Sequence, residues 1–370
     1  MAANDHGLST LPVEEAKKAA ATMRQHIASL YSAEQVETTP EDVFLFQGGM
    51  SAITQVAVGL QGLAKERAKG QEQQQQQAYR VAAFGFLYLD TFKVLDRILG
   101  FGNVLYGQGS SEDLDVLEAD LVSGQRIDAL YVEFPGNPLL KSVDVERLHA
   151  LATKYDFMLV VDDSIGTPAN LVLAPFCDIV CSSLTKMYSG ACNVMGGSVV
   201  HEDTYFPLDV LVMRANSAGF EERVAASNRN GASVAERLRK HRTVESVLYP
   251  LGSPTQPLYD RCKRPGAGYG FMMSVRFAEP EAAVAFHDAL DVAKGPSFGT
   301  NFTLACPYVV LAHYLEMDWA GQFGVWEHLV RISVGIEDVE MVLAVIDRAL
   351  DAADEKHGPA ATANQVQQAG

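Results

Sequence analysis

Apolar residues recur along this chain with two different periods, and the two patterns follow each other in blocks. Six of them repeat at spacings of three and four, which is typical of an amphipathic helix: Val13, Ala16, Ala20, Met23, Ile27 and Leu30. Short apolar runs that predict buried strands lie at 43–46, 80–84, 103–106, 129–134 and 157–161. Helical patterns separate these runs, as at 143–155. Strands that are apolar on both faces are typical of parallel sheets, so the alternation predicts a mainly parallel α/β sheet with right-handed crossovers.

Beyond residue 201 the pattern changes. Helices are predicted at 206–216 and 220–242, strands at 244–249, 268–277 and 328–335, and covering helices at 280–292 and 339–352. These elements indicate a smaller α+β domain. We therefore expect four parts: an N-terminal helix and arm at 1–42, a large α/β domain at 43–225, the smaller domain at 226–352 and a flexible tail at 353–370. The glutamine-rich stretch at 70–78 predicts a flexible surface loop.

Composition narrows the classes of function. With 370 residues, 48% of them apolar and 20% charged, the chain can form a large core and is typical of a soluble globular protein. Its formal charge of −17 argues against nucleic-acid and anionic-membrane partners. No apolar run approaches the ~20 residues that a membrane helix needs, and residues 1–10 lack a signal pattern. The five cysteines lack a disulfide-framework spacing. Their odd number and spacing fit reduced thiols, so we expect a cytoplasmic protein. Cys177 and Cys181 lack a second close pair of ligands, so we expect no metal site.

Lys186 follows a short apolar strand and lies within a polar segment. Ser183 and Thr185 precede it by three positions and one position. On an extended segment these hydroxyls lie on the same side, because the side-chain period is two, and they can bind one anionic group together. A partly desolvated lysine amine can hold a carbonyl as a Schiff base. Lysine with a phosphate-binding pair is what pyridoxal phosphate (PLP) requires, whereas a surface lysine in a serine-rich loop is the alternative.

An acidic residue lies 24 positions before Lys186. Asp162 ends the apolar run 157–161, which predicts a carboxylate at the carboxyl end of a buried strand, where ligands bind in open α/β sheets. A carboxylate at the pyridine nitrogen keeps that nitrogen protonated and makes the PLP ring an electron sink. An aspartate in this place is more often a helix cap or a turn residue. The combination with Lys186 favours a PLP site.

Three motifs carry a resemblance to a known family. The segments V-V-D-D-S-I-G-T-P at 160–168, S-S-L-T-K-M-Y-S-G at 182–190 and N-V-M-G-G at 193–197 resemble the Cys/Met-metabolism PLP enzymes of fold type I. The resemblance extends over about residues 20–350. It implies a mainly parallel, seven-stranded-type sheet domain with a smaller α+β domain. The segments at 42–53, 106–115 and 133–142 are most similar to the fungal cystathionine γ-synthase branch.

The resemblance implies further cofactor contacts. Backbone amides at Gly49 and Met50 would hold the phosphate, which agrees with glycines that precede a helix and expose its N–H groups. Tyr88 would stack on the cofactor ring and assist proton transfer, and Asn137 would hydrogen-bond the phenolic oxygen. Without the resemblance, we would expect Tyr88 to pack in the core and Asn137 to form part of a turn.

Arg331 is the sharpest candidate in the second half of the chain. It interrupts an apolar strand pattern at 329–335, and an arginine on such a strand needs a partner that its planar fork can bind. A structural salt bridge is one explanation. The resemblance implies instead that Arg331 binds the α-carboxylate of an amino-acid substrate and that Ser297 borders the same carboxylate.

The implied activity is γ-substitution on an activated homoserine ester, O-succinyl- or O-acetylhomoserine, by a thiol such as cysteine. Lys186 would hold PLP and move protons. Cystathionine γ-lyase, acylhomoserine sulfhydrylase, a secondary-metabolic γ-substitution enzyme and a non-catalytic paralogue remain alternatives. The resemblance also implies a homodimer or homotetramer in which a Tyr-x-Arg pair from a neighbouring subunit completes the phosphate site. Neither residue type occurs before Arg24, so either the chain is a shortened form or this contact to the phosphate is lost, and we expect weaker PLP binding than the family norm.

Overall fold

A five-stranded parallel sheet organises the first half of the chain. The computed structural model describes residues 11–69, 79–199 and 205–356. The strands run in the order β3-β2-β4-β5-β6, with bounds β2 (Arg80–Phe84), β3 (Gly102–Tyr106), β4 (Ala129–Glu133), β5 (Met158–Asp162) and β6 (Ile179–Cys181). Every residue of β4 is buried, because helices cover both faces of a parallel sheet. The parallel α/β prediction is confirmed.

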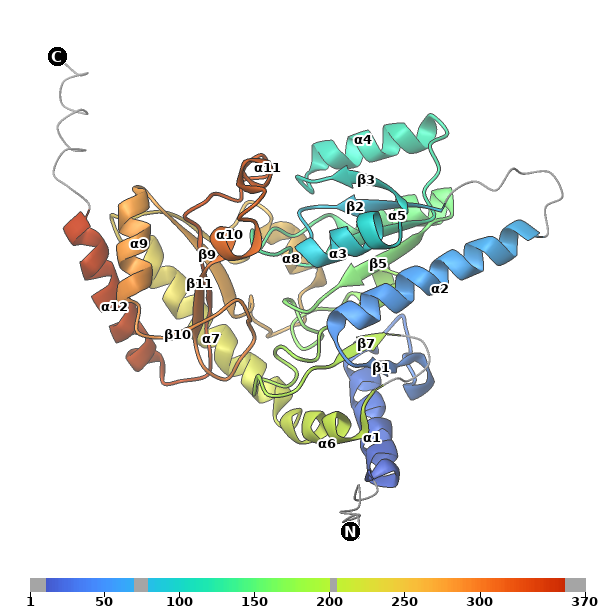
Figure 1. The fold of residues 1–370 in the computed structure, drawn as a ribbon, viewed down its shortest axis with the longest axis horizontal. Coiled ribbons are helices and arrows are strands. Elements are labelled where there is room, and N and C mark those ends of the chain that lie inside the picture. Colours follow the sequence, from blue (N-terminus) through green and yellow to red (C-terminus); the bar gives the residue numbers. More distant parts are fainter. Residues whose placement is uncertain (1–10, 70–78, 200–204, 357–370) are drawn as a thin grey trace, which may run out of the picture. The chain divides into compact units, whose positions relative to one another are not determined.

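The helices of this region are α1 (Val13–Tyr31), α2 (Gly49–Lys69), α3 (Leu89–Lys93), α4 (Ser111–Val122), α5 (Val145–Tyr155) and α6 (Pro207–Asn216), with a π-helical turn at Val94–Ile98. Helix α2 runs along one side of the sheet (Figure 1), and its apolar stripe packs against the strands. In that contact Ile53, Val56 and Leu60 share a core with Val81 and Val160. A stripe of period 3.6 therefore covers one face of the sheet. Leu63, whose spacing continues this stripe, is nevertheless 53% exposed.

The remaining two strands of this region do not extend the parallel sheet. Strands β1 (Phe44–Phe46) and β7 (Gly197–Val199) form a separate antiparallel pair. A single bridge between Ser182 and Ser198 connects this pair to the end of β6. The expected seven strands are thus arranged as a sheet of five and a pair of two.

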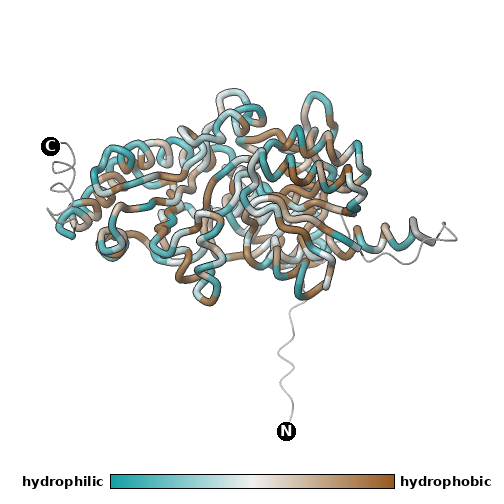
Figure 2. Tube along the Cα trace, turned by 90° about the horizontal axis from the view of Figure 1, so that it is seen from above, coloured by the Kyte–Doolittle hydropathy of each residue, from teal (hydrophilic) through white to brown (hydrophobic). Residues whose placement is uncertain are grey.

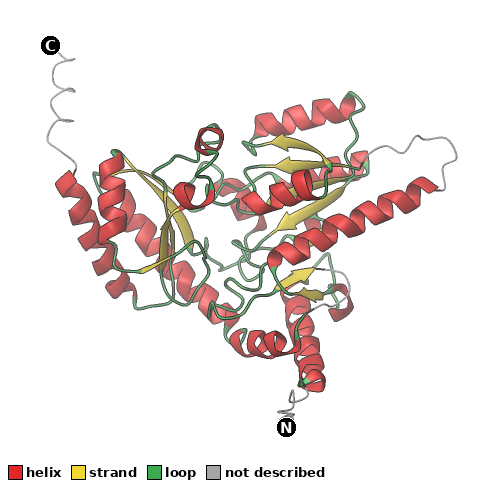
Figure 3. Ribbon diagram, in the orientation of Figure 1, coloured by secondary structure: helices red, strands yellow, loops and turns green. Residues whose placement is uncertain are grey.

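A mixed sheet forms the second half of the chain. Its order is β10-β11-β12-β9-β8, with bounds β8 (Val244–Leu248), β9 (Met272–Phe277), β10 (Ala293–Lys294), β11 (Leu304–Pro307) and β12 (Val330–Ser333). The helices α7 (Phe220–Arg239), α9 (Pro280–Ala289) and α12 (Val339–Lys356) share one apolar core with it. Figure 3 shows these helices beside the sheet, and Figure 2 shows hydrophobic segments, in brown, in the interior. The α+β prediction is confirmed.

Several short elements were not predicted. They are β7, β10, β11, α8 (Gln256–Cys262), α10 (Tyr308–Ala312) and α11 (Met317–Gly321). Elements of two to seven residues carry too little periodicity to be recognised. Helix α12 continues to Lys356, four residues into the predicted tail, because Ala353 extends its buried stripe. Predictions for residues 1–10, 70–78 and 357–370 lie outside the described part of the chain.

The chain forms two compact units. The first comprises Met1–Glu133 and Asp144–Glu221, and the second comprises Phe134–Val143 and Glu222–Gly370. The segment Phe134–Val143, which leaves β4, therefore belongs with the second unit. No helix in the described ranges is long and apolar enough to cross a membrane.

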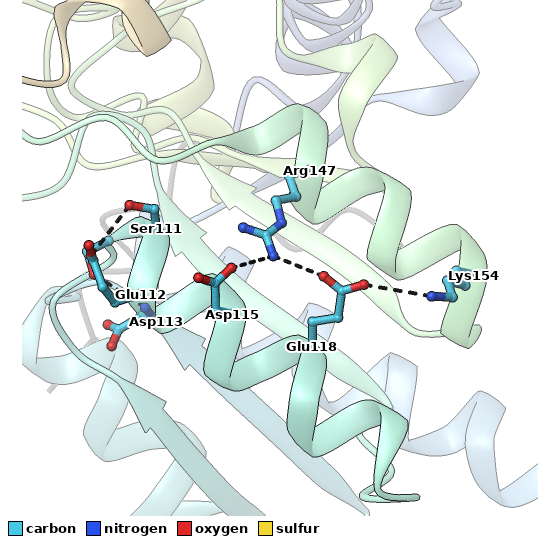
Figure 4. Close-up of polar contacts among 8 residues, drawn as sticks. Ser111, Glu112, Asp113, Asp115, Glu118, Arg147 and Lys154 are labelled. Carbon is cyan, nitrogen blue, oxygen red and sulfur yellow. Dashed lines mark hydrogen bonds and ion pairs between the residues drawn. The ribbon is translucent and has the colours of Figure 1, made fainter.

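An ion-pair network connects α4 to α5 on the surface of the first unit. Arg147 Nη2 lies 2.7 Å from Asp115 Oδ1 and 2.9 Å from Glu118 Oε2. Lys154 Nζ lies 3.7 Å from the other oxygen of Glu118 (Figure 4). Hydrogen bonds to Glu118 and Asp115 raise the pKa of Arg147. Because water surrounds much of this network, each of the two pairs of Arg147 contributes only about 0–1 kcal/mol to stability.

Candidate active site

Three side chains form a row at the carboxyl edge of the parallel sheet. Glu133 ends β4, Asp162 ends β5 and Cys181 ends β6. The strand register places Asp162 beside Glu133 on one side and beside Cys181 on the other. Asp162 therefore lies where the apolar run predicted it, at the sheet edge at which α/β proteins bind ligands.

The carboxylate of Asp162 is half-buried and interacts with a neighbouring lysine. Its Oδ1 accepts a hydrogen bond from the backbone N–H of Ser164 at 2.8 Å. Burial raises the pKa of Asp162, whereas hydrogen bonds from Ser164 and the positive charge of Lys186 act in the opposite direction. The charge of Lys186 acts on Asp162 because the turn after β6 brings Lys186 back toward the end of β5. The structure thus brings together the two residues that carried the sequence argument.

Lys186 lies in a compact turn rather than on an exposed loop. Its backbone N–H donates to the carbonyl of Ser183 at 3.2 Å, and its carbonyl accepts from Gly190 N–H at 2.8 Å. Its neighbours Met187 and Tyr188 are buried, and Lys186 itself is half-buried. These features do not fit a surface lysine in a serine-rich loop. They fit an amine held in a partly desolvated place.

The geometry expected for Ser183 and Thr185 is different in the structure. The extended segment ends at Ser182–Ser183, and residues 184–189 form turns, so a side-chain period of two does not apply. The Thr185 hydroxyl donates to the carbonyl of Gly196 at 3.2 Å and accepts from its N–H at 3.0 Å. Thr185 therefore fixes the two chain segments to each other. Ser183 faces the start of α2 instead.

Glycines let three segments approach closely beside Ser183. A Cβ atom on Gly49 would lie 2.8 Å from the Cβ of Ser183, so only glycine fits at the first residue of α2. A Cβ atom on Gly197 would lie 2.9 Å from the backbone nitrogen of Gly49. The first-turn N–H groups of α2, those of Gly49 and Met50 among them, have no carbonyl partner within the helix. The positive end of α2 is thus placed beside the turn that carries Lys186.

Tyr88 precedes α3 and is 40% exposed, so it is not a core residue. Its hydroxyl donates to Asp90 Oδ2 at 2.9 Å. Its backbone N–H donates to the carboxylate of Glu133, which is 8% exposed. Glu133 was not a candidate in the sequence, because a glutamate at the end of a strand gives no local signal. It fixes the backbone of Tyr88 at the same sheet edge as Asp162.

A second buried carboxyl group adjoins Asp162 and was also missed. Asp163 is 0% exposed. The hydroxyl of Tyr31, at the end of α1, lies 2.9 and 3.1 Å from its two oxygens. Burial raises the pKa of Asp163 to about 7, with hydrogen bonds from Tyr31 and Ser182 acting against this and the charge of Asp162 adding to it. Because 132 positions separate Tyr31 from Asp163, sequence pattern could not connect them.

In the second unit, Arg331 and Asn137 lie together. Arg331 is 3% exposed and Asn137 4%. Nη1 of Arg331 donates to Asn137 Oδ1 at 3.1 Å, and Nη2 donates to the carbonyl oxygens of Ser297, at 3.1 Å, and of Pro296. No carboxylate of the described residues forms an ion pair with Arg331, so the salt-bridge explanation has no partner there. Ser297 contacts Arg331 through its backbone carbonyl.

The residues of the first unit fit the chemistry of PLP. Burial raises the pKa of Asp162 despite its protein partners, and a cationic ring nitrogen would offset that cost. The glycine contact between α2 and Ser183 leaves helix N–H groups for a phosphate. Lys186 supplies an amine, and Tyr88 supplies an exposed aromatic face.

Comparison with known proteins agrees with this fit. Residues 19–351 match the family described as Cys/Met metabolism PLP-dependent enzyme. Cystathionine gamma-synthase of Neurospora crassa is 43% identical over 334 residues, which cover 85% of this chain and 53% of that protein. The cystathionine gamma-synthase-like protein ankD of Aspergillus thermomutatus is 38% identical over 373 residues, 94% of this chain and 64% of that protein. The chain thus spans about half to two thirds of the length of these relatives.

Solved structures give the same fold. Cystathionine gamma synthase from Xanthomonas oryzae pv. oryzae, in complex with aminoacrylate and cysteine, superimposes with a TM-score of 0.75 at 23% identity. The match covers 91% of this chain and 86% of that chain. The matched family, the curated relatives and the shared fold together show that this chain belongs to the Cys/Met metabolism PLP-dependent enzymes.

Proposed function

We propose that this chain catalyses γ-substitution on O-succinyl- or O-acetylhomoserine by a thiol such as cysteine, with cystathionine as the product. The observation that carries the proposal is that Asp162 ends β5 at the carboxyl edge of the parallel sheet, where the charge of Lys186 acts on its carboxylate. An amine and a carboxylate so placed are the two groups that PLP chemistry requires.

Named residues would hold the cofactor. Asp162 would face its ring nitrogen, and Tyr88 would lie against its ring. The N-terminus of α2 with Ser183 would bind its phosphate, and Lys186 would anchor it. Asn137 would use an N–H of its amide for the phenolic oxygen. When bound, PLP supplies an electron-poor ring that stabilises negative charge on the carbon atoms of an amino acid.

The cradle itself would come from Gly49, Met50, Ser183 and Thr185. The close contact of Gly49 with Ser183 supports a direct role for both. Thr185 would act through the Gly196 backbone, which its hydroxyl already holds. A Gly49→Ala change would separate the two segments and weaken phosphate binding.

Lys186 would also move protons during turnover. Its amine would take a proton from Cα of the amino acid and deliver protons at neighbouring carbons, as a general base and acid. Tyr88, whose hydroxyl is hydrogen-bonded to Asp90, would be a second group able to carry a proton.

Arg331 would bind the α-carboxylate of the substrate. It is a buried cation whose described partners are neutral oxygens. A buried charge is costly unless an opposite charge compensates it, and a bound carboxylate would do so. The substrate class that follows is an α-amino acid.

Borohydride treatment of the PLP-loaded protein followed by peptide mapping tests the cofactor site. We expect a pyridoxyl group on Lys186; a label on another lysine would overturn the assignment. The loaded protein is then given each acylhomoserine with cysteine, with sulfide, or with no thiol. Cystathionine confirms γ-substitution, and homocysteine from sulfide indicates a sulfhydrylase. Cysteine together with a 2-oxo acid, formed when the loaded protein is given cystathionine alone, indicates a lyase.

A protein that is labelled at Lys186 but turns over none of these substrates would support a secondary-metabolic γ-substitution. Absence of any label would support a non-catalytic paralogue.

We further infer a homodimer or homotetramer in the cytoplasm, which sedimentation and cell fractionation would test. Relatives named as cystathionine gamma-synthases support the small-molecule amino-acid substrate class.

A further inference from the structure

Tyr308 holds the side chain of Arg331, although it lies outside β12 and is distant from Arg331 in the sequence. Tyr308 is the first residue of α10 and is 4% exposed. Its backbone N–H donates to the carbonyl of Leu329 at 3.2 Å, which ties it to the residue just before β12. Its side chain reaches both Arg331 and Asn137 within the second unit. Its position is therefore fixed independently of any ligand.

The ring of Tyr308 lies against the buried guanidinium. The central carbon of that group is 4.8 Å from the centroid of the Tyr308 ring and 5.5 Å from that of Phe298. An aromatic face attracts a cation, and the attraction is greater where water is excluded. No described carboxylate pairs with Arg331. These rings and the neutral oxygens therefore position the guanidinium without neutralising its charge, so that an anion can still bind to it.

The hydroxyl of Tyr308 determines which way the Asn137 amide points. A guanidinium only donates hydrogen bonds, so the oxygen of Asn137 must face Arg331, as it does at 3.1 Å. The amide nitrogen then points the other way and needs an acceptor. Tyr308 Oη accepts from it at 3.1 Å. Without that oxygen the buried amide loses a partner and its preferred orientation.

We propose that Tyr308 is a positioning residue for carboxylate recognition: its ring and its hydroxyl, through Asn137, hold the Arg331 guanidinium in the orientation that binds the α-carboxylate. This rests on the proposed function of Arg331. The two contributions are separable, because phenylalanine keeps the ring and removes only the hydroxyl. A leucine removes both.

The test compares ligands that differ only in the carboxylate. PLP-loaded protein is titrated with L-2-aminobutyrate and with L-2-aminobutyramide, and binding is followed by the cofactor absorbance. In the wild type the acid should bind much more tightly than the amide. Tyr308→Phe should reduce this ratio about tenfold, and Tyr308→Leu should reduce it further. A purely structural role would weaken both ligands equally and leave the ratio unchanged, which would overturn the proposal.

Two controls make the result specific. Tyr314→Phe changes a tyrosine that is 66% exposed and should leave the ratio at the wild-type value. In an Asn137→Ala background, Tyr308→Phe should have little further effect, because the hydroxyl acts through the Asn137 amide. Additive effects of the two changes would show that the hydroxyl acts by another route.

Failure of this inference and failure of the proposed function give different results. Borohydride should label Lys186 in wild type, Tyr308→Phe and Tyr308→Leu alike. Labelling with an unchanged acid-to-amide ratio in both variants would refute only the role of Tyr308. A wild type that binds acid and amide equally would refute carboxylate recognition by Arg331 itself.

Discussion

Replacing Asp163 by asparagine should remove an unfavourable effect of rising pH on the stability of the first unit. Asp163 is fully buried, and its pKa is raised from an ordinary value of 3.8 to about 7. A carboxyl group with a raised pKa holds its proton more tightly in the folded than in the unfolded state. Its stabilising effect is therefore complete below pH 3.8 and is lost as the pH rises through about 7.

The size of the effect follows from that interval. Each pH unit over which only the unfolded state has lost the proton costs about 1.4 kcal/mol of folding free energy. Between pH 5 and pH 8 most of the cost falls below pH 7, so the wild type should lose about 2.5 kcal/mol through this group. Asparagine cannot ionise and can still accept a hydrogen bond from Tyr31. The stability of Asp163→Asn relative to wild type should therefore rise by about 2.5 kcal/mol over the same range.

The assay must report on the first unit, because a chain of two units need not unfold in one step. Hydrogen exchange of the β5 amides in apo-protein gives the opening free energy there at each pH. Both tryptophans, Trp319 and Trp326, lie in the second unit. Their fluorescence during urea unfolding therefore serves as an internal control that the substitution should not change.

Infrared titration gives an independent check. The carboxylic-acid C=O band of Asp163 should be present at pH 6, disappear above pH 8, and be absent from Asp163→Asn. If the stability difference between variant and wild type is the same at pH 5 and pH 8, Asp163 is ionised throughout. The structure's account of this buried pair would then be wrong.

Three further substitutions test other parts of the structure. Asp162→Asn should keep the borohydride label at Lys186 but lose activity about 100-fold or more, because a neutral amide cannot compensate a cationic ring nitrogen; near-normal turnover would mean that another acid performs this role. Arg331→Ala should raise KM for the amino acid about 30-fold or more, with the Lys186 label intact. An unchanged kcat/KM would exclude Arg331 from substrate binding. Arg147→Ala should cost at most about 1 kcal/mol, and the loss should shrink between 0.05 and 1 M salt as the pairs to Asp115 and Glu118 are screened. Urea unfolding at the two salt concentrations measures this, and a loss that does not depend on salt would point to packing of the arginine side chain.

Local pattern was enough to predict the larger elements and to place Asp162 and Lys186 near one edge of the parallel sheet. Helix α1 and strand β2 lie where the sequence predicted them, because a helix stripe or an apolar run depends only on residues close together in the chain. Of the predicted α1 stripe, Ala16, Met23 and Ile27 are buried, whereas Val13 is 42% exposed. Asp162 and Lys186 were paired because each follows an apolar run at the same end of its strand. Parallel topology brings those ends to one edge without further information. Arg331 was recognised because a lone charge on an apolar strand is conspicuous.

The tertiary structure decided what depends on distant residues. It turned the segment after Ser183, so that Thr185 binds the Gly196 backbone rather than lying in an extended row with Ser183. It also brought Tyr31 to Asp163 over 132 positions and Tyr308 to Asn137 over 171. A tyrosine gives the same local signal whether it packs in a core or bonds to a buried polar group. Only chain folding, which sets burial and partner together, distinguishes the two, and for that reason the residues that position the site could not be found from sequence pattern.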